Sequence, residues 1–158
     1  MFEIRPVEQR DRDWIAQFLT EHWGSPRVVS RGQVHSAELL PGFIVVIRGQ
    51  RVGLITYQVD GKECEIVTLD STIEDCGMGT ALIDEAKLAA AAEGCKRLWL
   101  VTSNDNTKAL RFYQKRGFRL AALYSDALNE ARKLKPENPV VGIDGIPLRD
   151  EIELELRL

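Results

Sequence analysis

Histidine, cysteine and methionine are scarce in this sequence of 158 residues, and the scarcity excludes several kinds of site. There are only two histidines, His22 and His35, and three cysteines without C-x-x-C spacing, so we expect no metal site. The odd number of cysteines does not fit a disulfide framework. It predicts the reduced thiols of an intracellular protein.

Long apolar runs and an excess of basic residues are also lacking. No apolar stretch approaches the roughly 20 residues that a membrane span needs, and the N-terminal MFEIRPVEQRDRDW is unlike a signal peptide. A formal net charge of -3 argues against a general nucleic-acid binder. We therefore expect a cytoplasmic protein with no membrane or nucleic-acid partner. Its length fits one domain spanning residues 1–158.

The first forty residues predict a strand, a helix and a mixed segment. Phe2–Arg5 alternates apolar and charged residues, as a half-buried strand does. A helix follows to about Trp23, because apolar residues recur on one stripe and Asp11 can cap or charge its start. The segment from Arg27 to Leu40 predicts a short helix followed by a loop.

The rest of the chain predicts an antiparallel meander followed by alternating helices and strands. Asp60-Gly61 is a hairpin signal, because both central residues of a type I′ turn need positive φ. The expected strands are Phe43–Ile47, Val52–Val59, Lys62–Leu69, Arg97–Thr102, Phe118–Tyr124 and Glu151–Leu156. The expected helices run from Gly79 to about Gly94, from Asn106 to about Gly117 and from Asp126 to Lys135. These elements predict one α+β unit.

A glycine-rich turn, Gly77-Met78-Gly79, stands between a strand and the long helix. The first N–H groups of a helix have no internal partner, and glycine lets an anion approach them closely. The alternative is a tight turn with no ligand. A Rossmann fingerprint would need a third glycine where Leu82 stands, and the Lys-Ser or Lys-Thr of a P-loop is absent.

Two motifs together resemble the GNAT superfamily of N-acetyltransferases. The pyrophosphate motif of that family, (Q/R)-x-x-G-x-(G/A), reads here from Glu74 to Gly79, with glutamate in place of Gln or Arg. A second motif, N-x-x-A-x-x-F-Y followed by G-F, reads from Asn106 to Tyr113 and continues at Gly117-Phe118. Asn106, Ala109 and Tyr113 are spaced i, i+3 and i+7, so they share one helix face.

This resemblance implies the GNAT fold: a mixed, largely antiparallel central sheet of about six or seven strands with helices on both faces. It also implies acetyl-CoA as cosubstrate and Tyr113 as the acid that protonates the departing thiolate. The backbone near Thr68 and Leu69 would contact the thioester. The implied cofactor-binding residues are Thr68, Leu69, Glu74, Asp75, Cys76, Gly77, Met78, Gly79, Thr80, Asn106, Ala109 and Tyr113.

The general base and the acceptor pocket are the less determined parts of the site. Glu63 and Glu65 face the same way on one strand, and some relatives place a catalytic glutamate there. The alternative is that both are structural carboxylates and that a water chain removes the proton. The resemblance places the acceptor between the first helix and the second strand. Candidate residues there, which could equally be ordinary surface or packing, are Trp23, Arg31, His35 and Glu38.

Two of these residues suggest specific roles. Arg31 could hold a carboxylate or phosphate of the acceptor, and His35 could act as the base. The sequence thus predicts an N-acetyltransferase for a small-molecule primary amine, acting by direct attack in a ternary complex. Acetylation of a protein N-terminus or lysine, and an acyl-CoA sensor without catalysis, are the alternatives. The last strand could pair with or swap into a neighbour, which suggests a homodimer.

Overall fold

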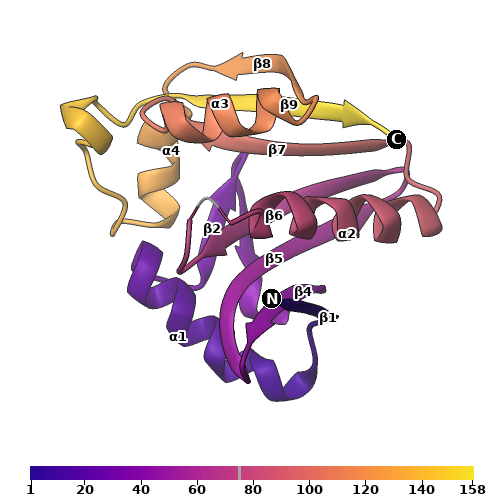
Figure 1. The fold of residues 1–158 in the computed structure, drawn as a ribbon. Helices are drawn as coiled ribbons and strands as arrows, with labels where there is room; N and C mark the ends of the chain where they lie inside the picture. Colours follow the sequence, from indigo (N-terminus) through magenta and orange to yellow (C-terminus); the bar gives the residue numbers. More distant parts are fainter. Residues whose placement is uncertain (75) are drawn as a thin grey trace.

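A mixed seven-stranded sheet forms the centre of the computed structural model, which describes residues 1–74 and 76–158 (Figure 1). Its strand order is β1-β4-β5-β6-β7-β9-β8, and only β6 and β7 are parallel neighbours. The α+β sheet predicted from the sequence is confirmed. Its strands are β1 (Glu3–Pro6), β4 (Gly42–Ile47), β5 (Gln50–Asp60), β6 (Glu63–Ser71), β7 (Arg97–Ser103), β8 (Arg119–Tyr124) and β9 (Glu151–Arg157).

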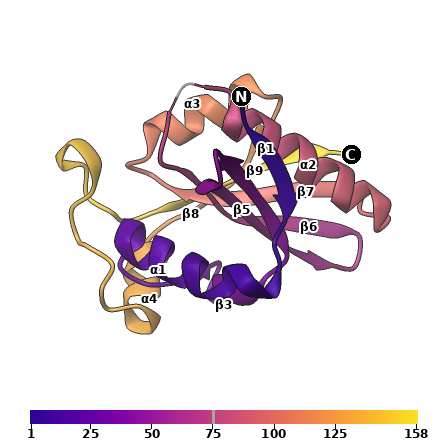
Figure 2. The ribbon, with the colours of Figure 1, turned by 60° about the horizontal axis from the view of Figure 1, so that its bottom comes forward.

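Helices cover both faces of this sheet (Figure 2). On one face, α2 (Met78–Ala92) packs through Leu82 and Ile83 against the sheet, and α3 (Thr107–Lys115) lies beside it. On the other face lie α1 (Arg12–Trp23) and α4 (Ala127–Leu134), and the buried side of α1 packs on β4 and β5. No helix in the described part of the chain is long and apolar enough to cross a membrane.

The segment between α1 and β4 differs from its prediction. In place of a short helix, Arg27–Ser30 (β2) and Gln33–Ser36 (β3) form an antiparallel hairpin, followed by one turn of 3-10 helix at Ala37–Leu39. The turn residues Arg31 and Gly32 have φ of 49° and 77°, the positive values that a type I′ turn requires. Three valines in these strands favour the extended conformation. The hairpin lies on the α1 face of the sheet (Figure 2).

The last strand forms where the sequence predicts it, as β9, but it does not lie at an edge of the sheet. β9 pairs with β7 on one side and with β8 on the other, so both of its edges are used within the chain. Neither edge of β9 is therefore free to pair with a neighbouring copy, and the predicted homodimer stays a prediction. Instead, β8 is the strand at that border of the sheet.

Strands β6 and β7 separate along their length. They pair only where Glu63–Glu65 lies beside Arg97–Trp99, and they diverge beyond that point (Figure 1). The register of β6 with β5 slips in the same region, which makes Val67 the extra residue of a β-bulge. A V-shaped gap thus opens in the middle of the sheet.

A buried carboxylate, Asp11, ties the N-terminal elements together. It accepts hydrogen bonds from the Arg5 guanidinium at 2.7 and 2.8 Å, from Arg51 Nε at 2.9 Å and from the backbone N–H of Glu8 at 2.7 Å. Its side chain does not cap α1, although the sequence suggested that role. The Arg5 bond holds the pKa of Asp11 far below the usual range, against the opposing effect of burial.

We predict that Asp11→Asn lowers the free energy of unfolding at pH 7 by about 2–3 kcal/mol, because it removes charge-assisted hydrogen bonds from two arginines. Since the pKa of Asp11 is lowered by folding, its contribution is present above the pKa of the unfolded state, about 3.9, and fades below it. Urea titrations at pH 7 and pH 3 should therefore show a smaller difference at pH 3. The exposed Asp13 provides the control Asp13→Asn, and equal effects of the two changes would contradict the prediction.

Candidate active site

A cavity of about 290 Å³ occupies the V-shaped gap on the face that carries α2 and α3. The end of β6, the glycine turn, the start of α2 and one side of α3 line it. Ten of the twelve predicted cofactor residues are among its walls. Thr68 is not, and Asp75 lies outside the described residues. The lining residues are Leu69, Asp70, Ser71, Ile73, Glu74, Cys76, Gly77, Met78, Gly79, Thr80, Leu82, Asn106, Lys108, Ala109, Phe112, Tyr113 and Arg116.

The two glycines of the turn are needed for different reasons. Gly77 is the N-terminal cap of α2 and has φ of 83°, a left-handed conformation that favours glycine. At Gly79 a Cβ atom would lie only 2.9 Å from Cζ of Phe112, so a side chain there would push α3 away. The first N–H groups of α2, which lack helical partners, therefore lie open beside the cavity. This is an anion cradle.

Charged side chains stand at the rim of the cradle. Nζ of Lys108 lies 2.6 Å from Oε2 of Glu74, so the glutamate that departs from the family motif is paired across the cavity mouth. Arg116 lies over the Phe112 ring, and its Nε donates to Oγ1 of Thr80 at 2.7 Å. Sequence reasoning missed Lys108 and Arg116. They lie within and beside the second motif, but at positions where the motif specifies no residue.

The α3 residues of the second motif lie where the sequence predicts. Asn106 caps the helix, its Oδ1 accepting from the backbone N–H of Ala109 at 3.1 Å. Tyr113 is buried and packs edge-on against Phe112 and Phe118. Burial, and secondarily the negative charge of Asp70, raise the pKa of Tyr113 well above its usual value. Its hydroxyl therefore stays protonated and available as a donor.

Asp70 is a site residue that the sequence did not single out. It lines the cavity from the end of β6, and its Oδ1 accepts from Nε1 of Trp23 at 3.0 Å. Burial raises the pKa of Asp70 to about 6, while the indole hydrogen bond and the nearby His22 partly offset that rise. Trp23 belongs to α1 on the opposite face, so this bond spans the V-shaped gap.

A second buried carboxylate lies on the α1 face, where β6 and β7 part. Glu65 is 7% exposed and accepts from Oγ of Ser30 at 2.5 Å. Nε2 of His35 lies 3.5 Å from Oε1 of Glu65, and this buried nitrogen has no hydrogen-bond partner within residues 1–74 and 76–158. Burial raises the pKa of Glu65, against the lowering effects of the Ser30 bond and of the charges on His35 and Arg31.

Of the other predicted residues, Glu63, Arg31 and Thr68 each have partners of their own. Glu63 is exposed and pairs with Nη1 of Arg97 at 3.1 Å, so it lies outside the buried group around Glu65. Arg31 is in the hairpin turn, and its Nη1 lies 3.3 Å from Oε1 of Glu153. Glu38 lies on the 3-10 turn, with a buried Oε2 that has no hydrogen-bond partner in the described part of the chain. The hydroxyl groups of Thr68 and Thr56 share a hydrogen bond, with their Oγ1 atoms 2.6 Å apart.

The whole arrangement places two kinds of chemistry on the two sides of one gap. The cradle beside α2 can hold a phosphate group, and Tyr113 can donate a proton next to it. On the other side, Glu65 can accept a proton in a buried setting. In the described residues, no three histidine, cysteine or acidic side chains are grouped so as to hold a metal ion.

Comparisons with known proteins agree with this geometry. The sequence model of the "Acetyltransferase (GNAT) family" matches residues 8–118. YdhI of Bacillus subtilis (strain 168) is 42% identical over 153 residues, covering 96% of each chain. The fold is similar to that of an IAA acetyltransferase from Bacillus cereus, with TM-score 0.78, 21% identity and full coverage of both chains. It is also similar to a GNAT acetyltransferase from Elizabethkingia anophelis with acetyl-CoA bound, with TM-score 0.72, 19% identity and coverage of 99% and 98%.

Proposed function

Since this chain belongs to the GNAT family of acetyltransferases, we propose that it transfers the acetyl group of acetyl-CoA to a primary amine of a small molecule. One observation carries the proposal: the gap between β6 and β7 joins an anion cradle on one face to the buried Glu65 on the other. We further propose that residues 1–158 act as one domain in the cytoplasm. A homodimer could form along β8, where Leu120 and Leu123 are exposed.

The residues around the cradle fit acetyl-CoA. Gly79 carries no side chain, and a Cβ there would collide with Phe112, so the start of α2 stays uncovered for a pyrophosphate. Lys108 and Arg116 add positive charge at the rim of the cavity. Ala109 is small enough to let a pantetheine arm pass along α3 toward Tyr113. When bound, acetyl-CoA supplies an acetyl group activated as a thioester. Because both reactants are held in one gap, proximity contributes strongly to the rate.

The chain's own residues would handle the protons. Glu65 accepts the proton that the amine loses as its nitrogen bonds to the acetyl carbon, directly or through a water molecule. Backbone N–H groups at the bulge near Thr68 and Leu69 stabilise the negative charge on the carbonyl oxygen. Tyr113 donates a hydrogen bond to the sulfur as the carbon–sulfur bond breaks. Its raised pKa keeps it a donor, but makes complete transfer to a thiolate, whose thiol has a pKa near 8.5, less favourable.

An acyl-CoA sensor without catalysis is the second candidate. The observation that favours it is the negative charge of Glu74 at the mouth of an anion site. Buried Glu65 and Tyr113 favour the enzyme, since a sensor needs neither a proton acceptor nor a proton donor beside the thioester. Acetylation of a protein N-terminus or lysine would use the same cofactor cavity and the same proton transfers, and would differ from the proposed function only in the acceptor.

The proposed activity predicts release of free thiol from acetyl-CoA when a panel of primary amines is added. A colorimetric thiol assay measures it, with short peptides carrying a free N-terminus or lysine as a second panel. We expect Tyr113→Phe to lower turnover by about tenfold or more, because a transition-state hydrogen bond is lost, while CoA affinity changes little. Calorimetric binding of acetyl-CoA without thiol release from either panel would support the sensor instead.

The raised pKa of Glu65 predicts an acidic limb in kcat/KM above the usual carboxylate range. The base acts when deprotonated, so activity should fall as the pH drops through that pKa. Glu65→Gln should remove this limb and lower kcat by about 10²–10⁴-fold. Glu63→Gln should retain the limb, because Glu63 is exposed and paired with Arg97. A limb that survives in Glu65→Gln and vanishes in Asp70→Asn would assign the proton to Asp70.

The rim charges predict that Glu74→Gln strengthens CoA binding. Removing one negative charge from the mouth of the cradle, and releasing Lys108 from its pair, should lower Kd by about two- to fivefold at low salt. The gain should shrink in high salt, because exposed charges are screened. Asp84→Asn, an exposed change on α2 outside the cavity, is the matched control for charge. Titration calorimetry measures both, and a weaker complex with Glu74→Gln would mean that the glutamate itself contacts the ligand.

A further inference from the structure

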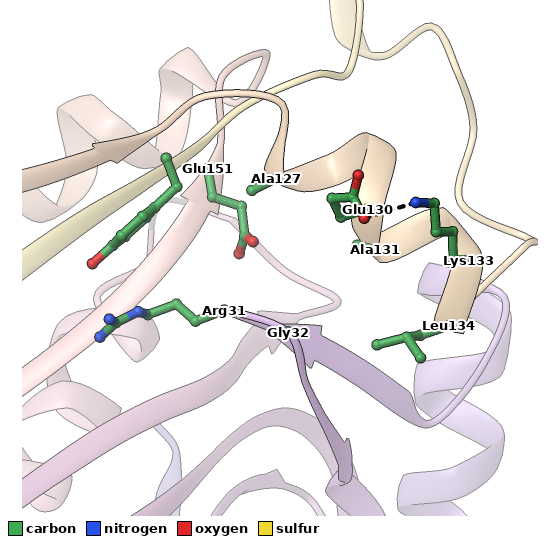
Figure 3. A pocket seen from close by; sticks show the side chains of 9 residues that line it. Arg31, Gly32, Ala127, Glu130, Ala131, Lys133, Leu134 and Glu151 are labelled. Carbon is green, nitrogen blue, oxygen red and sulfur yellow. Dashed lines mark hydrogen bonds and ion pairs between the residues drawn. The ribbon is translucent and has the colours of Figure 1, made fainter.

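A second cavity, of about 550 Å³, lies on the α1 face of the sheet, between the turn of the β2–β3 hairpin, α4 and the β8–β9 border (Figure 3). We call it the distal cavity. Three α4 side chains and Tyr124 give it an apolar and aromatic wall, and its size suits a small molecule. Its lining residues are Arg31, Gly32, Tyr124, Ala127, Glu130, Ala131, Lys133, Leu134 and Glu151.

Pairing accounts for all but one of the charges that line the distal cavity. Lys133 pairs with Glu130 at 2.9 Å on the exposed rim, and Arg31 pairs with Glu153. Glu151 remains. It is 3% exposed and points into the space between the Arg31–Gly32 turn and α4 (Figure 3). Its carboxylate accepts the backbone N–H of Arg31 and is attracted by the charge of Arg31, but among the described residues no lysine or arginine nitrogen lies within ion-pair distance of it.

Glu151 and Glu65 belong to the same face of the sheet and influence each other. Burial raises the pKa of both carboxylates, and repulsion from Glu65 raises that of Glu151 further, whereas the backbone N–H and the charge of Arg31 oppose the rise at Glu151. A buried carboxylate without an ion-pair partner costs free energy, and a cation placed in contact with it recovers part of that cost. His35 adds a buried Nε2 without a hydrogen-bond partner in the described chain, next to Glu65. The Glu151 carboxylate and Nε2 of His35 could therefore each form a further hydrogen bond or ion pair with a polar ligand.

Arg31 shows what kind of charge this face accepts. Its guanidinium lies over the rings of Tyr124 and Trp99, with its Cζ atom 4.9 and 5.6 Å from their centres, and it pairs with Glu153. Aromatic faces beside a carboxylate attract cations. The charge of Arg31 is thus already matched, so it does not favour the acidic acceptor that the sequence suggested. An anionic acceptor would meet three buried glutamates here.

We propose that the distal cavity binds a second ammonium group of the acceptor, so that the substrates of this chain are α,ω-diamines. The proposal rests on the acetyl transfer proposed above. The reacting amine lies at Glu65 and His35, and the far ammonium lies against Glu151. The apolar wall of Tyr124, Ala127, Ala131 and Leu134 covers the methylene spacer between them.

The test compares α,ω-diaminoalkanes of three to eight carbons with 1-aminoalkanes of the same length, by thiol release from acetyl-CoA. We expect kcat/KM to favour the diamine by about 10–100-fold at the best length, because a charge-assisted hydrogen bond to a buried carboxylate is gained. Glu151→Gln should reduce this ratio to near one, while Glu85→Gln, on α2 across the sheet, should retain it. Ala127→Leu, which narrows the cavity from α4, should shift the preference to shorter diamines.

The outcomes separate this proposal from the acetyltransferase activity. Equal use of monoamines and diamines by the wild-type protein would overturn the diamine site and leave acetyl transfer intact. If no amine releases thiol, the proposed activity fails. Calorimetric titration of 1,5-diaminopentane into the protein then tests separately whether the distal cavity binds a diamine. Binding that Glu151→Gln weakens at least tenfold then supports the site, whereas absence of binding overturns it.

Discussion

The parting of β6 from β7 is the constraint on which the rest of the site depends. Pairing ends at Glu65 and Trp99, and the bulge at Val67 turns the remainder of β6 away. An unbroken sheet would seal its two faces from each other. Here Asp70 lines the cofactor cavity and also accepts a hydrogen bond from Trp23 of α1. The two faces therefore meet at the gap, as the proposed transfer between two bound substrates requires.

Alternation along the strands gives the two faces opposite chemistry. The apolar side chains of Cys64, Ile66, Leu98 and Leu100 form a core with α2. The buried carboxylates of Glu65, Glu151 and Glu153 belong to the other face. A fold selected only for stability would cover that second face with apolar residues, because burying carboxylates is unfavourable. Their presence beneath a small hairpin and α4 is best explained by function.

The sequence predicted the residues that line the cavity beside α2 and α3 far better than the arrangement of the α1 face around Glu65. Gly77, Gly79 and the Asn106–Tyr113 helix act through local geometry, which short motifs record. The α1 face around Glu65 is built from contacts between distant segments. Period-two spacing cannot distinguish Glu63 from Glu65. In the structure, Ser30 and His35 of the hairpin contact the buried Glu65, whereas the exposed Glu63 pairs with Arg97. That hairpin was itself missed, since its turn places Arg31 at a positive φ that non-glycine residues rarely adopt.

The same reasoning sharpens the significance of Glu74, where the chain departs from the family motif. Glu74 and Lys108 are both largely exposed, and an ion pair of that kind contributes at most about 1 kcal/mol. The cradle depends instead on the left-handed turn at Gly77 and on the close contact of Gly79 with Phe112, neither of which a side chain can replace. A motif position matters in proportion to the geometry it fixes. The change at 74 therefore alters the charge at the rim and leaves the anion cradle in place.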